Sequence, residues 1–63
     1  MVITYVTRCA GTGLRFRNRA AHVASVTDEP YPPGGTLRVI RDAQGRVLGG
    51  PLVSEIESWE IEV

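Results

Sequence analysis

The chain of 63 residues contains no lysine, only one cysteine and no long apolar run. Cys9 has no partner for an intrachain disulfide, and together with His22 it offers too few ligands for a closed zinc site. No apolar stretch approaches the roughly 20 residues that span a bilayer. Residues 1–8 also lack the basic start and apolar stretch of a signal peptide. We therefore expect a cytoplasmic protein with no metal, no disulfide and no membrane partner.

The short length predicts a single domain over residues 1–63. A chain of this size buries only about 60% of its unfolded surface, so its stability should be marginal. Without disulfides or a metal, self-association or docking to a partner is the remaining way to bury more apolar area. Proteins this short are seldom standalone enzymes. We expect an accessory subunit, an inhibitor, or a small protein of the phage or plasmid type.

The net charge is zero, but the two signs are unevenly placed along the chain. Residues 1–27 carry four arginines and no acidic residue, whereas residues 53–63 carry four glutamates and no basic residue. Every basic residue is arginine, whose planar group suits bidentate contact with carboxylate or phosphate. Codon bias in a GC-rich genome is a simpler explanation for the missing lysine.

Alternation of apolar and polar residues, interrupted by turn residues, predicts about five or six short strands. The expected strands cover residues 2–7, 14–19, 22–27, 36–41, 46–48 and 58–63. Glycine-containing turns are expected at residues 8–13 and 42–45, and a proline-rich loop at residues 28–35. Ser54 and Glu57 have the spacing of a capping box for one helical turn. The pattern predicts an all-β fold, a small twisted antiparallel sheet or a partly closed barrel.

Residues 17–26 leave two interpretations open. Ala20 and Ala21 favour a helix, whereas Val23, Val26 and Thr27 are β-branched and precede a loop. We predict a strand that continues the preceding one through a bend at residues 18–21. The alternative is an α+β fold with one helix over residues 17–26. The expected core residues are Ile3, Tyr5, Leu14, Phe16, Val23, Val26, Leu37, Val39, Val47, Ile56, Trp59 and Ile61.

The proline-rich loop is the main candidate for contact with a partner. Pro30, Pro32 and Pro33 stiffen it, which lowers the cost of ordering it on binding. Tyr31 supplies the rigid amphipathic surface that interfaces favour. An inert connection with Tyr31 folded onto the sheet would have the same composition. We predict a non-enzymatic binding module that acts by protein–protein contact or as a homodimer, with these four residues at the contact.

The alternating arginines suggest a second function, nucleic-acid binding. Arg15, Arg17 and Arg19 share one face of a predicted strand and lie about 6–7 Å apart, close to the phosphate repeat of a nucleic acid. The zero net charge and the lack of aromatic residues on that face weigh against this alternative. Glu60 and Glu62 on the last strand are the competing partners for these arginines.

No catalytic residue or cofactor is predicted. The loop at residues 8–13 lacks the ending of a phosphate-binding loop and the full glycine pattern of a dinucleotide site. A lone Cys9 and a lone His22 are weak support for a nucleophile and its base. Cys9 is more simply a small apolar residue.

Overall fold

The computed structural model describes residues 1–63 as six strands and one turn of 3-10 helix. These elements are β1 (Val2–Arg8), β2 (Arg15–Ala20), β3 (Ser25–Pro30), β4 (Thr36–Arg41), β5 (Val47–Gly49), η1 (Val53–Glu55) and β6 (Ile56–Glu62). The all-β prediction is confirmed. The alternative of a helix over residues 17–26 is wrong, because β2 and β3 occupy both ends of that range.

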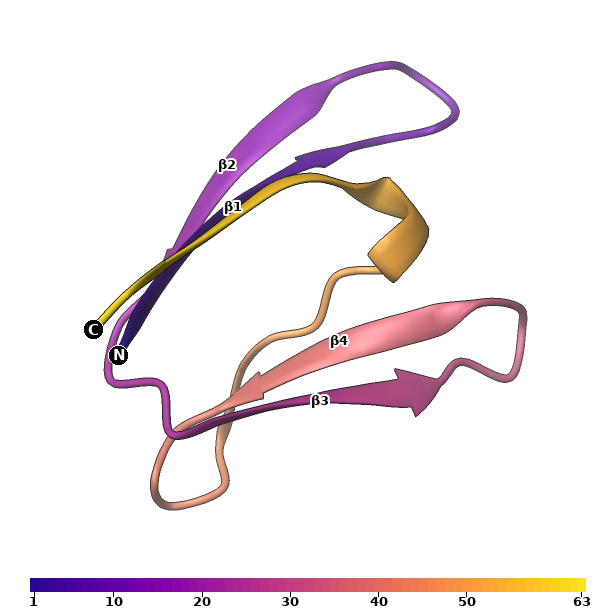
Figure 1. The fold of residues 1–63 in the computed structure, drawn as a ribbon. Helices are drawn as coiled ribbons and strands as arrows, with labels where there is room; N and C mark the ends of the chain where they lie inside the picture. The colour runs from indigo at the N-terminus through magenta and orange to yellow at the C-terminus, as the bar shows by residue number, and fades with distance from the viewer.

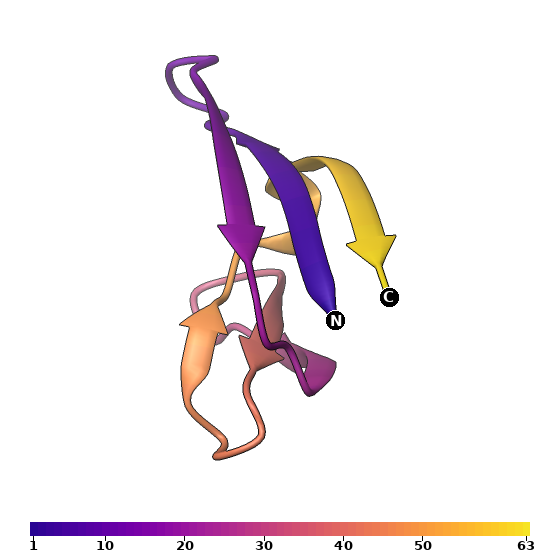
Figure 2. The same ribbon diagram turned by 90° about the vertical axis from the view of Figure 1, so that its left-hand side faces the viewer.

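The strands form two antiparallel sheets that pack as two layers (Figure 1). Sheet A has the order β2-β1-β6, and sheet B has the order β3-β4-β5. Figure 2 shows sheet A with β1 between its two edge strands and sheet B beneath it. The chain passes from sheet A to sheet B between β2 and β3, and it returns through η1 to β6. The two ends of the chain lie side by side, because Val2 pairs with Glu62.

The bend between β2 and β3 begins where the predicted strand over residues 22–27 was expected to start. His22 takes a left-handed backbone conformation with φ of 61°, which histidine adopts more readily than most residues with a side chain. The Val23 amide donates to the Met1 carbonyl, and the Ala24 amide donates to the Arg41 carbonyl. The backbone therefore changes its hydrogen-bonding partner from β1 to β4 within two residues. Val23 is buried and anchors the bend.

The predicted loop over residues 28–35 is shorter than expected. β3 continues through Asp28 and Glu29 to Pro30, which pairs with Thr36. Proline is tolerated there because it ends an edge strand, where its missing N–H does not interrupt the sheet. The true loop covers residues 31–35, and the Tyr31 amide closes it by donating to the Gly35 carbonyl at 3.1 Å.

Two other predicted turns have different outcomes. The hairpin between β4 and β5 is confirmed, and its Gly45 has the positive φ of 81° that the turn requires. The predicted capping box is wrong in detail. A helical turn does form at η1, but Ser54 lies inside it, and Leu52 precedes it without a side-chain capping bond.

The core between the sheets is small. Its five buried side chains are Ile3, Tyr5, Ala20, Val23 and Ile40. Ile3 from sheet A and Ile40 from sheet B are the two that are fully buried. Ile40 was not among the expected core residues. Ile40 faces sheet A, whereas Val39, the preceding residue of β4, is buried on the opposite face of sheet B.

Four of the expected core residues are instead exposed: Leu14, Phe16, Val47 and Ile61. Phe16 shares the inner face of β2 with the buried Ala20 but is 54% exposed. The reason is visible in Figure 1, where the two sheets diverge toward the β1–β2 hairpin. Strand alternation predicts the correct face for Phe16, but the separation of the sheets at this end leaves the side chain uncovered.

Candidate functional site

A groove of about 340 Å³ opens along the side of the molecule where β3 and β6 face each other. These are edge strands of different sheets, so no strand pairing closes this side. The groove is lined by Val26, Asp28, Arg38, Trp59 and Ile61. Its volume lies in the lower part of the range of roughly 300–1,000 Å³ that is typical of binding pockets.

Strand alternation brings these side chains into the space between the sheets. Val26 and Asp28 are two residues apart on β3, and Arg38 of β4 lies directly opposite Asp28. On β6, Trp59 pairs with Tyr5 and so shares the inner face of sheet A with the core. The groove is therefore the open margin of the hydrophobic core.

Three of the groove residues form a fixed unit. The Arg38 guanidinium lies 4.9 Å from the centre of the Trp59 ring. Its Nε donates to Asp28 Oδ1 at 2.9 Å, and its Nη2 donates to Asp28 Oδ2 at 3.3 Å. The hydrogen bonds from Arg38 lower the pKa of Asp28, and the same bonds raise the pKa of Arg38. Trp59 is supported from behind by Tyr5, with ring centres 5.4 Å apart.

This arrangement suits the recognition of a side chain from another molecule. Val26, Trp59 and the 54% exposed Ile61 provide apolar contact surface. The Asp28–Arg38 pair provides donors and acceptors at the margin, held in place by its own hydrogen bonds. Tryptophan and arginine are the residue types that most often dominate protein-binding energies.

The predicted contact residues of the proline loop lie near one end of this groove. Pro30 follows Asp28 on the same face of β3, so the groove leads toward the loop. Tyr31 at the hairpin tip is 38% exposed, and Pro32 and Pro33 are exposed beside it. The contact role of these four residues remains a prediction.

The three arginines of β2 lie on the outer face of sheet A, away from the groove. Arg15 reaches across β1, and its Nε donates to both carboxylate oxygens of Glu57, the shorter distance being 2.9 Å. Arg17 and Arg19 take part in none of the four ion pairs of the chain. Glu60 and Glu62 of β6 lie on the same face, with β1 between them and the arginines. The arginines therefore do not pair with these two glutamates.

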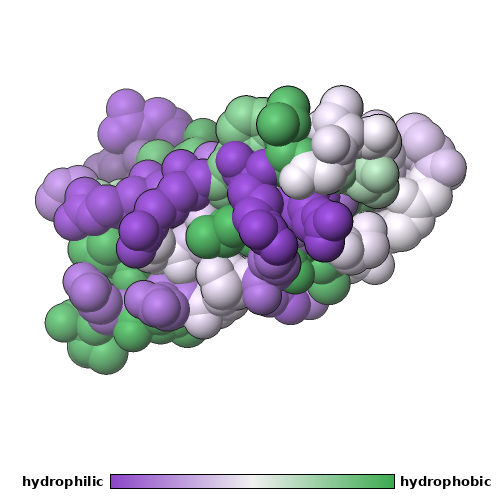
Figure 3. Space-filling view, turned by 90° about the horizontal axis from the view of Figure 1, so that it is seen from above, coloured by the Kyte–Doolittle hydropathy of each residue, from purple (hydrophilic) through white to green (hydrophobic).

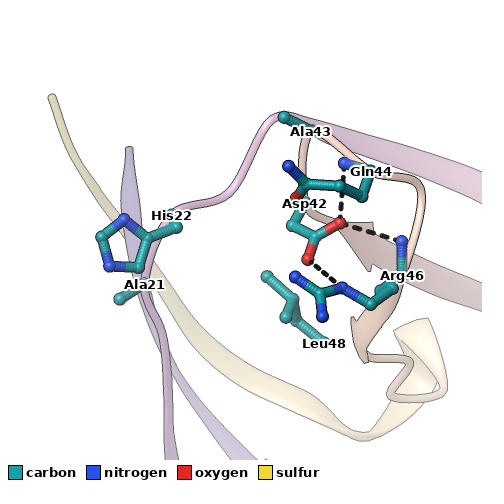
Figure 4. A pocket seen from close by; sticks show the side chains of 7 residues that line it. All are labelled: Ala21, His22, Asp42, Ala43, Gln44, Arg46 and Leu48. Atoms are coloured by element: carbon teal, nitrogen blue, oxygen red, sulfur yellow. Dashed lines mark hydrogen bonds and ion pairs between the residues drawn. The ribbon is translucent and has the colours of Figure 1, made fainter.

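A second cleft, of about 600 Å³, lies between the β2–β3 bend and the β4–β5 hairpin (Figure 4). Its residues are Ala21, His22, Asp42, Ala43, Gln44, Arg46 and Leu48. Asp42 Oδ1 accepts from the backbone amides of Gln44 and Arg46, and Oδ2 accepts from Arg46 Nε at 2.9 Å. These bonds, led by that from the Arg46 amide, lower the pKa of Asp42. Its carboxylate thus holds the hairpin turn together, and His22 stands apart from it.

Cys9 and His22 are not brought together. Cys9 follows β1 in the β1–β2 hairpin, whereas His22 follows Ala20, which pairs with Ile3 near the start of β1. Nearly the full length of β1 separates them. The hydrogen bond with the Thr12 side chain lowers the pKa of the Cys9 thiol, and the charge of Glu55 opposes this shift. No three histidine, cysteine, aspartate or glutamate side chains gather in a way that could hold a metal ion.

Helices with the length and hydrophobicity needed to cross a membrane do not occur in the structure. Comparisons with protein-family models, with curated proteins and with solved structures find no match.

The residues that line the groove are not predicted as a binding site from the sequence. Trp59 and Ile61 are expected in the core, and Asp28 is expected in a loop. The pairing of Asp28 with Arg38 has one sequence signal, because both are equally distant from the centre of the loop at residue 33. Two such residues face each other when the strands of the hairpin extend toward the loop. The predicted strand ends at residue 27, so the sequence analysis does not pair Asp28 with Arg38.

Proposed function

We propose that this protein is a non-enzymatic interaction module that binds a protein partner in the groove between β3 and β6. The observation that carries the proposal is the Trp59–Arg38–Asp28 unit at the margin of the core. An aromatic ring already stacked by an arginine, which is itself fixed by a carboxylate, is preorganised for contact. Preorganisation reduces the entropy lost on binding.

The strand beside the groove supports the binding of an extended segment. β6 runs from Ile56 to Glu62 and is an edge strand, so one side of its backbone has no partner in the sheet. Edge strands of this kind can accept a further strand from another protein. An added segment would place an apolar side chain against Trp59 and Ile61 while its backbone pairs with β6.

The proline loop extends this surface. Pro30 continues the inner face of β3 beyond Asp28, and Tyr31 follows at the tip. The loop is closed by its own backbone hydrogen bonds, so it offers a rigid surface. We expect Tyr31 to contact the end of a bound segment. The proline loop and the groove would then belong to one binding site.

Nucleic-acid binding by the β2 arginines has less support. Arg15 is engaged by Glu57, and the outer face of sheet A also carries Glu60 and Glu62. A phosphate backbone lying along the arginines would come close to these carboxylates, which repel it.

The proposal is tested with peptides selected on the wild-type protein from a random library. Trp59 is the only tryptophan, so its fluorescence reports directly on the groove. We expect selected peptides to change Trp59 emission, and Ile61→Ala to weaken their binding about fivefold to tenfold through lost apolar contact. Tyr31→Ala tests the loop in the same assay.

The control is Val47→Ala, which removes a similarly exposed apolar side chain on β5, outside the groove. It should leave peptide affinity unchanged. If selected peptides bind Ile61→Ala as tightly as wild type and leave Trp59 emission unaltered, the groove is not the binding site.

A further inference from the structure

The outer face of sheet A carries two sets of charges that no contact within the chain neutralises. Arg17 and Arg19 lie on β2, and Glu60 and Glu62 lie on β6. All four are exposed, and none takes part in an ion pair. Figure 3 looks onto the molecule from the side of sheet A and shows a largely hydrophilic surface broken by apolar patches.

The strand register arranges these charges in two parallel bands with an uncharged band between them. Thr4 of β1 has Arg19 on one side and Glu60 on the other. Neighbouring strands are about 4.8 Å apart, so the backbones of the basic and acidic bands lie about 10 Å apart. Between them, β1 presents the half-buried side chains of Val2, Thr4 and Val6. Between Val2 and Val6 of β1, the face is basic along one edge, uncharged in the middle and acidic along the other edge.

We propose that this face binds a second copy of the chain, forming a face-to-face homodimer. A two-fold axis parallel to β1 exchanges the two edges of the sheet, so the basic band of each protomer lies over the acidic band of the other. The register then places Arg19 of one protomer opposite Glu60 of the partner subunit, and the symmetry makes this contact twice. Val2 and Val6 meet their own copies along the axis.

The charge pattern also disfavours the competing symmetric arrangements. Edge-to-edge pairing of β6 with its own copy would bring Glu60 and Glu62 against the same residues of the other protomer. Edge-to-edge pairing of β2 would do the same with Arg17 and Arg19. Like charges directly opposite each other destabilise a strand pair. Face-to-face packing is the symmetric contact in which every band meets its complement.

The size of the face indicates a weak dimer. A seven-residue strand is about 23 Å long and three strands span about 15 Å, so the face covers about 350 Å² per protomer. The total of about 700 Å² is below the roughly 1,200–2,000 Å² that stable specific interfaces bury. We therefore expect rapid exchange and dissociation on dilution. The contact does not involve the groove, since Trp59 and Ile61 alternate with Glu60 and Glu62 and point to the opposite face of β6. The inference thus goes beyond the proposed function and does not depend on it.

The test combines two charge-reversal variants in sedimentation equilibrium between about 10 µM and about 1 mM protein. Arg17→Glu with Arg19→Glu leaves all four of these positions acidic, and Glu60→Arg with Glu62→Arg leaves all four basic, while the Arg15–Glu57 pair is unchanged in both. We expect wild type to approach twice the monomer mass at high concentration and each variant alone to stay monomeric. An equimolar mixture of the two variants should form a dimer again, because an acidic face then meets a basic one.

Salt gives an independent measurement on the wild-type protein. Raising ionic strength from about 0.01 M to about 1 M shortens the Debye length from about 30 Å to about 3 Å, and the dimer should weaken severalfold or more. Amide NMR signals of β1, β2 and β6 should shift with concentration, while those of β3 should not. This measurement needs no variant and holds even if a charge reversal impairs folding.

The control compares Arg19→Glu with Arg46→Glu, which makes the same charge change on the β4–β5 hairpin, away from this face, at an arginine that pairs with Asp42. Only Arg19→Glu should shift the equilibrium toward monomer. The proposal is overturned if wild type stays monomeric throughout, if the mixed variants stay monomeric, or if both single variants act alike. A monomer that binds mixed-sequence nucleic acid through Arg17 and Arg19 would also overturn it. Each of these results leaves the groove assay unaffected.

Discussion

Both sheets carry arginines and acidic residues, but only in sheet B do most of these residues pair with each other. In sheet B, opposite charges lie on adjacent strands of one hairpin. Asp28 of β3 pairs with Arg38 of β4 at 2.9 Å, and Glu29 of β3 pairs with Arg41 of β4 at 2.7 Å. The Thr27 hydroxyl joins the second pair by donating to Glu29 and accepting from Arg41.

In sheet A, like charges share a strand, and the two charged strands are not neighbours. β1 lies between β2 and β6 and carries no charged side chain on the outer face before Arg8. Only Arg15 bridges the gap, to Glu57. The comparison of the two sheets shows that strand order, and not only the number of charged residues, determines whether a charged side chain finds a partner within the chain. Opposite charges on a hairpin hold its strands together, whereas charges separated by a third strand stay available to another molecule.

The largest expected effect comes from the core that the two sheets share. Ile40→Ala removes a fully buried side chain of sheet B and should lower the free energy of unfolding by about 2–5 kcal/mol. Because a domain this small is marginally stable, both sheets should lose structure together. Urea unfolding followed by amide NMR checks this. Persistence of sheet A signals after sheet B has unfolded would contradict a common core.

Contact between the sheets also depends on the absence of a side chain at Gly49. A Cβ there would lie 2.6 Å from the Tyr5 hydroxyl oxygen, so Gly49→Ala should destabilise the fold by about 1–3 kcal/mol. Adding Tyr5→Phe removes the clashing oxygen and should restore most of the loss. Gly50→Ala is the control, since nothing lies within 4 Å of its Cβ position. Equal effects of the two alanine variants in thermal unfolding would rule out this explanation.

The contrast between paired and unpaired arginines can be measured directly. Arg38→Gln removes the stacking on Trp59, which is worth about 0.5–1 kcal/mol, and should lower Tm by several degrees. Arg19→Gln removes an arginine without an intrachain partner and should leave the Tm of the monomer unchanged at low protein concentration. If both variants lower Tm equally, the two sheets do not differ in the way described.

The smallest expected effect is a dependence of stability on acid. Hydrogen bonds from arginines lower the pKa of Asp28 and of Glu29, and both groups lie in sheet B. Their folded pKa values are below the unfolded ones, so the stabilisation is present above the ordinary carboxyl range and is lost as pH falls through the lowered values. Tm should therefore decline below about pH 5, and Asp28→Asn should flatten the decline. An unchanged slope in the variant would show that Asp28 does not contribute.

Much of the secondary structure follows from local pattern. The strand at β1, the β4–β5 hairpin and the alternation of Trp59 and Glu60 on β6 are visible in the sequence, because side-chain alternation and glycine turns are properties of neighbouring residues. β3 begins at Ser25 and not at residue 22 as the sequence predicts, because the switch of hydrogen bonds at Val23 and Ala24 requires Arg41 from a distant strand. Its end was misplaced because Pro30 at the end of an edge strand resembles a loop residue.

The pattern of neighbouring residues is enough to predict an all-β chain, the shared faces of most strands, and the separation of arginines on one strand from glutamates on another. Which strands become neighbours depends on the tertiary structure. It placed β1 between the two charged strands, left Phe16 and Ile61 uncovered, and set Trp59 beside Arg38 and Asp28. These outcomes depend on contacts between residues far apart in the chain, which strand alternation does not encode.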